Sequence, residues 1–449
     1  MKHIVVLGAG QSTPFLIFYL LQSAEENDWF ITVGDLNGEL AERSVAGHPR
    51  GQGIALDIND AATRSALMSK AQVVINMLTR PYQYLVALEC LTNGAHMLTA
   101  SYEEPRIRSL DADAHRKNIL ILNEMGLDPG IDHMKAMQLI QKVRSRGGTV
   151  VSFVSYGGGL PAPEANTNPL RYAITWNPRN VLMAGEDGAL YREDEKIKLL
   201  PFHQVFDRTW TVEVDGVGTF EAYPNRDSLS YEKALGLRED RTIIRGTLRY
   251  PGWSETWQHI VHLGLTNESL QIPGLQEMNY RDLTEMCLPL SPKGAKLEHE
   301  VADYLGISRT GRIMENLRWL GLFSHERIGR EVTTVAGAMI DLIRRKLMMP
   351  EGARDMVILV HEIEAIYPEE GNRREKITST MIEYGIPGGF TAISRTVGLP
   401  IAVAARLLLR DELPLTGCQI PTHPAVYDPV LRELTQNDLE FTERTETLT

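Results

Sequence analysis

Near the start of the chain stands the stretch Ile4-Val5-Val6-Leu7-Gly8-Ala9-Gly10, an apolar run that ends in two glycines one residue apart. Such a run predicts a β-strand that turns directly into a helix. The first glycine allows a tight turn, and the second lets the backbone approach a pyrophosphate at the N-terminus of the helix. The third glycine of this fingerprint is replaced by Thr13. The motif alone is therefore a weak sign of dinucleotide binding, and the segments that follow must support it.

A second apolar run, residues 29–33, ends in Gly34-Asp35. An acidic residue roughly 20 residues past the glycines is where dinucleotide-binding folds hold the ribose hydroxyls of the adenosine. The Asp35 carboxylate would accept a hydrogen bond from the 2′-hydroxyl of NAD and would repel the 2′-phosphate of NADP. Because no arginine follows before Arg43, we predict NAD, with NADP as the alternative; Asp35 could also simply end its strand in solvent.

Four further apolar runs are separated by segments of helical length: residues 53–57, 71–77, 96–99 and 119–122. Strands that alternate with helices predict a doubly wound parallel sheet of the Rossmann type. Asp57 ends the first of these runs, where such domains often contact adenine. From the residues we therefore predict that a dinucleotide is bound by Gly8, Gly10, Gln11, Ser12, Thr13, Asp35 and Asp57.

Length, charge and cysteine usage restrict the class of protein. A chain of 449 residues predicts two or three domains. The net charge of −12 argues against a nucleic-acid partner. No apolar run approaches the roughly 20 residues of a membrane span. The three cysteines lack CxxC spacing, and the fold starts at the N-terminus, so we expect a cytoplasmic protein without a membrane partner.

The segment 123–133, Asn-Glu-Met-Gly-Leu-Asp-Pro-Gly-Ile-Asp-His, follows the last of these runs. Ligands of open α/β sheets bind beyond the carboxyl ends of the strands, so this segment is a candidate for chemistry. Asp128 and Pro129 are predicted as the N-cap and first residue of the next helix, and capping alone is the alternative role of Asp128. Ser101 and Tyr102 follow the preceding run and should face the same crevice.

Glycine, proline and asparagine are dense in residues 155–169, which indicates a long functional loop. Two later segments place arginines beside turn-forming residues: Tyr-Pro-Asn-Arg-Asp-Ser at 223–228 and Arg-Gly-Thr-Leu-Arg-Tyr at 245–250. Arginine binds carboxylates through two parallel hydrogen bonds, which points to an anionic substrate. A surface ion pair is the alternative for each arginine. Two strands, at 356–364 and 374–381, and an apolar helix at 401–409 are predicted after them.

These motifs together resemble saccharopine dehydrogenases of the L-glutamate-forming type, and the likeness covers essentially the whole chain. The resemblance implies a Rossmann domain over 1–127 that 384–449 completes. It also implies a second α/β domain over 128–274 and 350–383, for substrate binding and dimerisation, with a mainly helical insertion over 275–349. A homodimer is expected on the same ground.

Members of that family oxidise saccharopine reversibly with NAD(P), and the resulting imine is hydrolysed to L-glutamate and 2-aminoadipate 6-semialdehyde. The resemblance associates Asp128 and Tyr102 with catalysis, as acid–base or hydrogen-bonding groups. Saccharopine carries three carboxylates, and the substrate-binding residues expected for it are Ser101, Arg226, Arg245 and Thr247. The resemblance also places Leu78 and Thr79 in a loop that borders the nicotinamide.

Three features depart from the family pattern: Gly157 stands where the family often has Cys, residues 77–82 replace a Leu-Ile-Pro-Tyr stretch, and Asp35 favours NAD where NADP is common. A related amine dehydrogenase, acting on lysine or carboxynorspermidine, is the first alternative, and a non-catalytic nucleotide-sensing protein is the second. The arginine motifs favour saccharopine, because a lysine side chain or polyamine lacks the distal carboxylates. No metal site is expected, since the chain shows no cluster of His and Cys.

Overall fold

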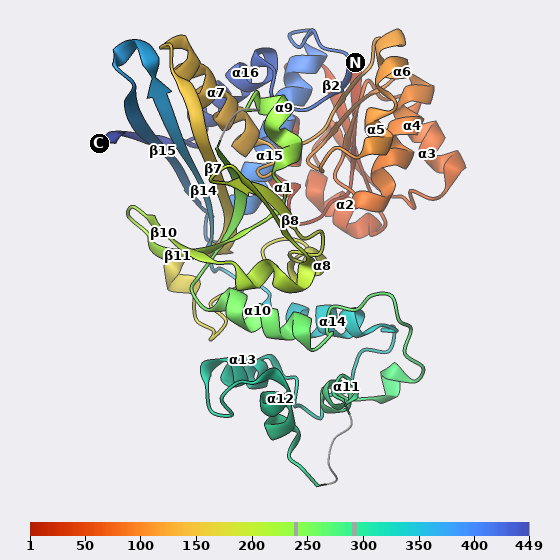
Figure 1. Cartoon of the computed structure of the whole chain (residues 1–449). Helices are drawn as coiled ribbons and strands as arrows, with labels where there is room; N and C mark the ends of the chain where they lie inside the picture. Colours follow the sequence, from red (N-terminus) through yellow and green to blue (C-terminus); the bar gives the residue numbers. More distant parts are fainter. Residues whose placement is uncertain (238–240, 290–293, 449) are drawn as a thin grey trace. The chain divides into compact units, whose positions relative to one another are not determined.

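A computed structural model describes residues 1–237, 241–289 and 294–448 (Figure 1). The chain forms two compact units. The first unit comprises Met1–Val150, Lys233–Gly236 and Leu359–Thr449, and the second comprises Val151–Glu232 and Leu237–Ile358. The domain boundaries inferred from the sequence stay a prediction.

The first unit contains a sheet of seven parallel strands in the order β16-β6-β5-β4-β1-β2-β3. The strands are β1 (Lys2–Leu7), β2 (Trp29–Asp35), β3 (Gly51–Ala55), β4 (Val73–Asn76), β5 (His96–Thr99), β6 (Leu120–Leu122) and β16 (Gly417–Gln419). The strand order reverses between β1 and β4, which makes their carboxyl ends the switch point where ligands bind. The doubly wound parallel sheet predicted from the sequence is confirmed.

The third strand lies two residues earlier than predicted, so it ends before Asp57 instead of at it. The reason is the packing of its glycines against helix α2 (Gly38–Val45). A Cβ atom on Gly53 would lie 2.2 Å from the backbone nitrogen of Glu42, so no larger residue fits at this position. Glycine weakens the apolar signal of a strand, and the sequence pattern therefore pointed to the apolar residues that follow.

The first unit also contains helices before, between and after the strands of this sheet. These are α1 (Pro14–Gln22), α2, α3 (Ala61–Met68), α4 (Gln83–Asn93), α5 (Pro105–Arg108), α6 (Asp111–Arg116), α7 (Ile131–Ser145), α15 (Ala392–Leu409) and α16 (Pro424–Gln436). Most of the short helix α9 (Glu232–Leu235) belongs to this unit as well. Pro14 occupies the first turn of α1, where its missing N–H leaves no bond unmade.

Helix α15 begins nine residues earlier than predicted and carries Pro400 in its interior. Gly398 lies against α1, where an added Cβ would approach the backbone nitrogen of Leu16 to 2.8 Å. By length and composition alone α15 could cross a membrane, but 83% of it is buried inside the structure. Its apolar side chains therefore serve as core.

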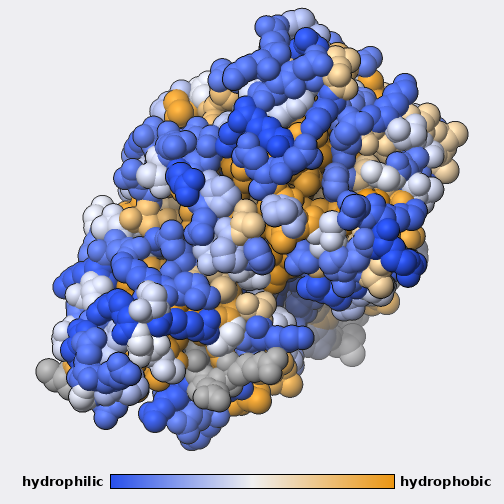
Figure 2. Space-filling model, turned by 90° about the horizontal axis from the view of Figure 1, so that it is seen from above, coloured by the Kyte–Doolittle hydropathy of each residue, from blue (hydrophilic) through white to orange (hydrophobic). Residues whose placement is uncertain are grey.

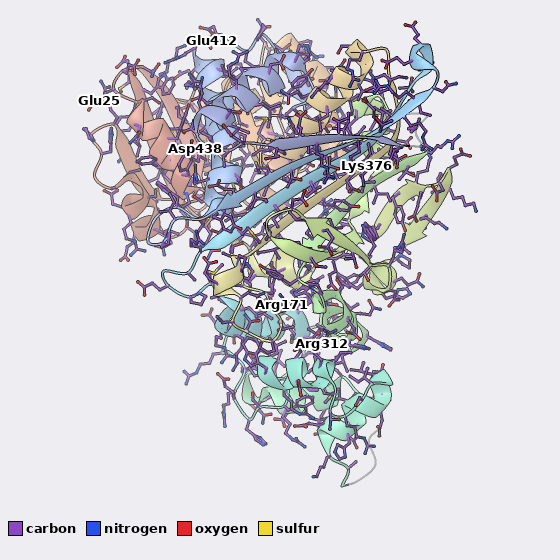
Figure 3. The ribbon with its side chains drawn as sticks, turned by 90° about the vertical axis from the view of Figure 1, so that its left-hand side faces the viewer. Glu25, Arg171, Arg312, Lys376, Glu412 and Asp438 are labelled. Carbon is purple, nitrogen blue, oxygen red and sulfur yellow. The ribbon has the colours of Figure 1, made fainter. Side chains whose placement is uncertain are left out.

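The second sheet has ten strands, with β10-β11-β13-β7-β14-β15-β17 as its main order. Its strands are β7 (Thr149–Pro161), β8 (Ala189–Glu193), β9 (Lys196–Leu200), β10 (Trp210–Val214), β11 (Gly218–Pro224), β12 (Arg226–Asp227), β13 (Thr242–Arg249), β14 (Asp355–Tyr367), β15 (Arg373–Tyr384) and β17 (Thr442–Leu448). The two strands predicted late in the chain are confirmed as β14 and β15, each longer than expected. Lys376, labelled in Figure 3, lies on β15 and contacts Glu362 of β14 at 3.0 Å.

The predicted loop is wrong for residues 155–161, and the predicted turn is wrong for residues 245–247, because both segments are strands of this sheet. Much of the glycine-rich segment belongs to β7, and Arg245-Gly246-Thr247 lies inside β13 and not in a turn. The parallel pairing of the two strands brings Gly157 opposite Thr247. A Cβ on Gly158 would lie 3.0 Å from the Cβ of Leu248, so the glycine allows close packing at this point. Here glycine reflects tight strand contact and not loop formation.

The helices of the second unit are α8 (Pro178–Leu182), α10 (Trp253–His262), α11 (Tyr280–Met286), α12 (Leu297–Leu305), α13 (Arg312–Leu320) and α14 (Val335–Leu347). Four of these, α11 to α14, fall in the stretch predicted as mainly helical. The face of the molecule seen from above is mostly hydrophilic, with apolar residues showing between polar ones (Figure 2).

Candidate active site

The turn after β1 is built for close approach to the loop after β4. Gly8 has φ +98°, a conformation that favours glycine. An added Cβ there would lie 3.4 Å from the carbonyl oxygen of Met77 and 3.6 Å from the Cδ2 of Leu78. The predicted glycine turn and the predicted nicotinamide loop are therefore neighbours at the switch point of the sheet.

The turn offers free amide groups to a ligand. Within the described parts of the chain, the backbone N–H groups of Gly10, Gln11 and Ser12 make no hydrogen bond. Thr13 closes the turn, since its amide and its hydroxyl both donate to the carbonyl oxygen of Gly10, at 3.0 and 2.8 Å. A Cβ on Gly10 would meet no atom within 4 Å. Open space and unpaired amides before α1 fit the pyrophosphate of a dinucleotide.

Asp35 joins the end of β2 to this turn. One carboxylate oxygen accepts a hydrogen bond from the Ala9 amide at 2.8 Å, and the other accepts one from the Asn37 amide at 2.8 Å. Asp57 lies beyond the neighbouring strand β3, is exposed, and accepts a hydrogen bond from the Asn59 amide at 2.9 Å. Both carboxylates thus stand at the carboxyl ends of adjacent strands, where an adenosine would lie.

The loop after β4 is held by a buried amide pair. Asn76 donates to the Oε1 of Gln83 at 3.0 Å, and Gln83 donates in turn to the carbonyl oxygen of Leu78 at 2.7 Å. Thr79 is exposed, and its carbonyl oxygen accepts a hydrogen bond from the Tyr82 amide. The buried side chain of Gln83 therefore fixes Leu78 at the switch point, and the backbone amide of Tyr82 holds Thr79 beside it.

Tyr102 and Asp128 lie together beyond the carboxyl ends of β5 and β6. The Tyr102 hydroxyl donates to the Oδ1 of Asp128 at 3.4 Å. Ser101, beside Tyr102, donates its amide to the Thr99 hydroxyl at 3.1 Å. Ser101, Tyr102 and Asp128 were predicted to face one crevice; Tyr102 and Asp128 are in contact, and Ser101 is the neighbour of Tyr102 in the chain. The hydrogen bond is long, as is common before a substrate tightens a site.

Asp128 does not cap the following helix, so that prediction is wrong. Helix α7 begins at Ile131, and its N-cap is Gly130. The loop folds back on itself, with hydrogen bonds of 2.9 Å from the Gly126 amide to the Pro129 carbonyl and from the Ile131 amide to the Gly126 carbonyl. A Cβ on Gly130 would lie 2.0 Å from the Gly126 oxygen, so only glycine fits. The Asp128 side chain turns to Tyr102 instead.

Behind this loop lies a buried cluster that was not predicted from the sequence: Glu124, Asp132 and His133. The His133 Nε2 lies 2.8 Å from Glu124, and its Nδ1 lies 3.1 Å from Asp132. Burial disfavours the imidazolium, but the two carboxylates outweigh burial and raise the pKa of His133 to about 9. The signal in the sequence was an acidic residue on each side of the Gly-Leu-Asp-Pro-Gly turn with a histidine at its end.

The predicted substrate arginines belong to the second unit. Arg226, at the start of β12, forms an ion pair with Asp187 and has φ +58°. The guanidinium of Arg245 is buried and lies 4.7 Å from the centre of the Tyr231 ring. Thr247, on the same strand β13, pairs with Tyr223 of β11.

Arg249 is a further buried arginine that the sequence analysis did not single out as a site residue. It is 5% exposed, and its guanidinium lies 4.8 Å from the ring of Trp253 and 5.1 Å from that of Tyr172. Its presence in the Arg-Gly-Thr-Leu-Arg-Tyr motif was the available signal. In the described ranges, no group of three or more His, Cys, Asp or Glu side chains is placed to hold a metal ion.

A glycine turn at the switch point of a doubly wound sheet is where such folds bind a dinucleotide, and the contact between Tyr102 and Asp128 lies at the same edge of this sheet, beyond β5 and β6. That combination places the chain among the nucleotide-dependent oxidoreductases.

Comparison with known proteins makes the class specific. A family model of the saccharopine dehydrogenase NADP binding domain matches residues 4–122, and one of the saccharopine dehydrogenase C-terminal domain matches residues 126–439. The NADP⁺-dependent, L-glutamate-forming saccharopine dehydrogenase of Schizosaccharomyces pombe is 31% identical over 99% of both chains. The corresponding enzyme of Saccharomyces cerevisiae is 30% identical over 96% of both.

Two further relatives extend the comparison. The apo structure of the L-glutamate-forming saccharopine dehydrogenase of Saccharomyces cerevisiae superposes with a TM-score of 0.86 at 28% identity, over 99% of this chain and all of that one. The mitochondrial α-aminoadipic semialdehyde synthase of Bos taurus is 32% identical over 98% of this chain, which spans 47% of that longer protein. The chain belongs to the saccharopine dehydrogenase family.

Proposed function

We propose that this protein oxidises saccharopine with a nicotinamide nucleotide and water, and releases L-glutamate and 2-aminoadipate 6-semialdehyde. The observation that carries the proposal is the contact of 3.4 Å between Tyr102 and Asp128, beyond the carboxyl ends of β5 and β6 in the sheet that also carries the nucleotide turn. Family membership supports the choice of substrate, since relatives that match nearly full length bear that activity in their names.

The reaction needs proton transfers that this pair can perform. The nicotinamide, when bound, supplies the hydride acceptor. The amine of saccharopine must be neutral before its carbon loses hydride, the attacking water must lose a proton, and the leaving nitrogen must gain one. A carboxylate and a phenol in contact can pass a proton between them, so Asp128 and Tyr102 are proposed to serve these transfers at the reacting nitrogen and carbon.

The arginines supply charge for the carboxylates of the substrate. We propose that Arg226, Arg245 and Thr247 bind the carboxylates of saccharopine, with Ser101 holding a polar group near the nicotinamide. Arg226 is about one-third exposed and Asp187 already neutralises it, so a substrate carboxylate would compete for its guanidinium. We expect Arg226→Ala to raise the KM for saccharopine with little change in nucleotide affinity. Arg309, whose ion pair with Asp303 is exposed, is the matched control.

The nucleotide is proposed to be NAD, with NADP as the alternative. Asp35 supports NAD, because its carboxylate stands at the end of β2 where a 2′-phosphate would bring a second negative charge. The matched family model and the fungal relatives are named for NADP, so this chain would differ from them in its choice.

Other aspects of the function rest on resemblance and composition. We propose a homodimer in the cytoplasm, with a small amino-acid substrate and without nucleic-acid or membrane partners. Light scattering of the purified protein would measure the mass of the assembly, and fractionation of cells would locate the protein.

The first test is the absorbance of reduced nicotinamide when purified protein meets saccharopine with NAD⁺ and, separately, with NADP⁺. We expect turnover with saccharopine and a higher kcat/KM for NAD⁺. Lysine and carboxynorspermidine are the comparison substrates. Turnover with one of them, and none with saccharopine, would assign the protein to a related amine dehydrogenase.

A further inference from the structure

Tyr102 and Asp128 are carried by two separate backbone segments, and each segment is held by a buried carboxylate. Glu124 brackets the first segment. Its amide donates to the Ser101 carbonyl at 3.0 Å, and its Oε1 accepts from the Glu103 amide at 3.0 Å. Tyr102 stands between these two anchor points, so the position of Glu124 determines the position of the Tyr102 backbone.

Asp132 holds the second segment in the same manner. Its amide donates to the Leu127 carbonyl at 3.1 Å, and its Oδ1 accepts from the Gly130 amide at 2.6 Å. Asp128 lies between these two anchor points. A carboxylate on the first turn of α7 thus fixes the loop that presents Asp128 to Tyr102.

His133 joins the two carboxylates. Its Nε2 lies 2.8 Å from the Oε2 of Glu124, and its Nδ1 lies 3.1 Å from the Oδ2 of Asp132. The imidazole therefore spans the gap between the segment of Tyr102 and the segment of Asp128. In its protonated form both ring nitrogens donate, one to each carboxylate.

The cluster is buried and strained, so its members depend on one another. Glu124, Asp132 and His133 are 4%, 2% and 2% exposed. Two carboxylates taken out of water need a cation between them, and loss of one member of such a set is costly. Glu124 also has φ +61°, an unfavourable conformation for a residue with a side chain. Strain of this kind persists where the surroundings hold the residue in place, and it concentrates at functional sites.

We infer that His133 is a positioning residue: it couples the backbone segment of Tyr102 to that of Asp128 and so sets the contact between the two proposed catalytic groups. This inference rests on the proposed function for its kinetic consequence, but its structural content does not depend on the substrate. His133 acts through the carboxylates of Glu124 and Asp132, so no direct role in proton transfer to substrate is assigned to it.

Two amide variants separate the two halves of the bridge, because the amide groups of Asn and Gln lie at different distances from the backbone. In His133→Asn the amide nitrogen takes the place of Nδ1, and in His133→Gln it takes the place of Nε2. His133→Asn should therefore keep the bond to Asp132, and His133→Gln should keep the bond to Glu124. Both variants cut the link, and if one fails to fold the other carries the test. His325→Gln, at an exposed histidine, is the control.

We expect kcat to fall about 10- to 100-fold in both variants, because displacing a reacting group by about 1 Å can cost about 100-fold in rate. The Kd of the nucleotide should change less than about twofold, because the glycine turn that binds it follows β1 and is separate from this cluster. The measured rate is divided by the concentration of protein that binds nucleotide, so that misfolded protein does not lower the apparent kcat. In the double variant Tyr102→Phe/Asp128→Asn, His133→Gln should have almost no further effect on rate. An equal loss in both backgrounds would overturn the inference.

Amide hydrogen exchange tests the same inference without any substrate. Exchange should accelerate at residues 101–103 and 127–131 in the His133 variants and stay unchanged in His325→Gln. Unchanged exchange in both segments would contradict the role of His133, even in an active enzyme. If the wild-type protein does not oxidise saccharopine but exchange responds as expected, the proposed function fails and the positioning role stands.

Discussion

At the scale of single residues, Asp128 does not cap helix α7 and contacts Tyr102 instead. Its carboxylate is therefore placed for proton transfer. We expect Asp128→Asn to lower kcat by about 100-fold or more, since a general acid–base group commonly contributes that much. The Kd of the nucleotide, measured by fluorescence titration, should stay within about twofold. Asp113→Asn, at an exposed aspartate on α6, should leave both quantities unchanged. Wild-type turnover in Asp128→Asn would remove the carboxylate from the mechanism.

Asp35 is the second residue whose single charge has a measurable consequence. Replacing it by Asn keeps an oxygen for one backbone bond and removes the negative charge. We expect the ratio of kcat/KM for NADP⁺ to that for NAD⁺ to rise at least about tenfold, because one charge near a phosphate is worth a kcal/mol or more. Glu39→Gln changes an exposed acid on neighbouring α2 and should leave the ratio as it is. An unchanged ratio in Asp35→Asn would mean that residues other than Asp35 determine the preference between NAD⁺ and NADP⁺.

At the scale of elements, the close contact of α15 with α1 makes a stability prediction. Gly398→Ala should destabilise the protein by about 1–3 kcal/mol, because the new methyl meets the backbone of Leu16 and overpacks the contact. Alanine is otherwise the better helix former by about 1 kcal/mol. Gly337→Ala on α14 meets only side-chain atoms and should be neutral or stabilising. Urea denaturation measures the free energy of unfolding of both variants. If Gly398→Ala stabilises the protein, α15 and α1 can move apart enough to accept the methyl group without loss of stability.

The elements also show what could be predicted from the sequence. The runs that became β1 and β2 are apolar and end at Gly or Asp, and these patterns report local burial directly. Glycines mislead where they serve packing between elements: β3 lies earlier than predicted, and the glycines of the segment 155–169 belong to strand β7. The partners of a glycine belong to other parts of the chain, and the sequence alone does not say which part approaches.

In the candidate site, too, some features could be predicted from the sequence and others could not. Tyr102 and Asp128 could be brought together because both follow strands of one parallel sheet, whose carboxyl ends share an edge. The missing cap at Asp128 could not be foreseen, because it depends on a backbone fold in which Gly130 touches Gly126. The His133 cluster was missed for a related reason: it depends on the same backbone fold, which places His133 on the first turn of α7 between Asp132 and Glu124.

At the scale of the whole molecule, His133 links stability to pH. Its pKa is raised to about 9 in the folded protein, above the usual value of 6.5. The folded state therefore binds the proton more tightly, and the resulting stability is complete below about pH 6.5 and is lost as pH rises through about 9. We expect the difference in unfolding free energy between wild type and His133→Gln to shrink over that interval. A constant difference would show that the imidazole does not change its charge there.

The last strand added to the nucleotide-binding sheet has a consequence for how the protein is made. Strand β6 pairs on its outer side with β16, which lies roughly 300 residues later in the chain. A ribosome that adds about 5–20 residues per second needs roughly 15–60 s to cover that distance. During this time the nascent chain carries an apolar strand with an open edge, the feature that invites pairing with other chains. The protein should therefore depend on chaperones most while its second half is being synthesised.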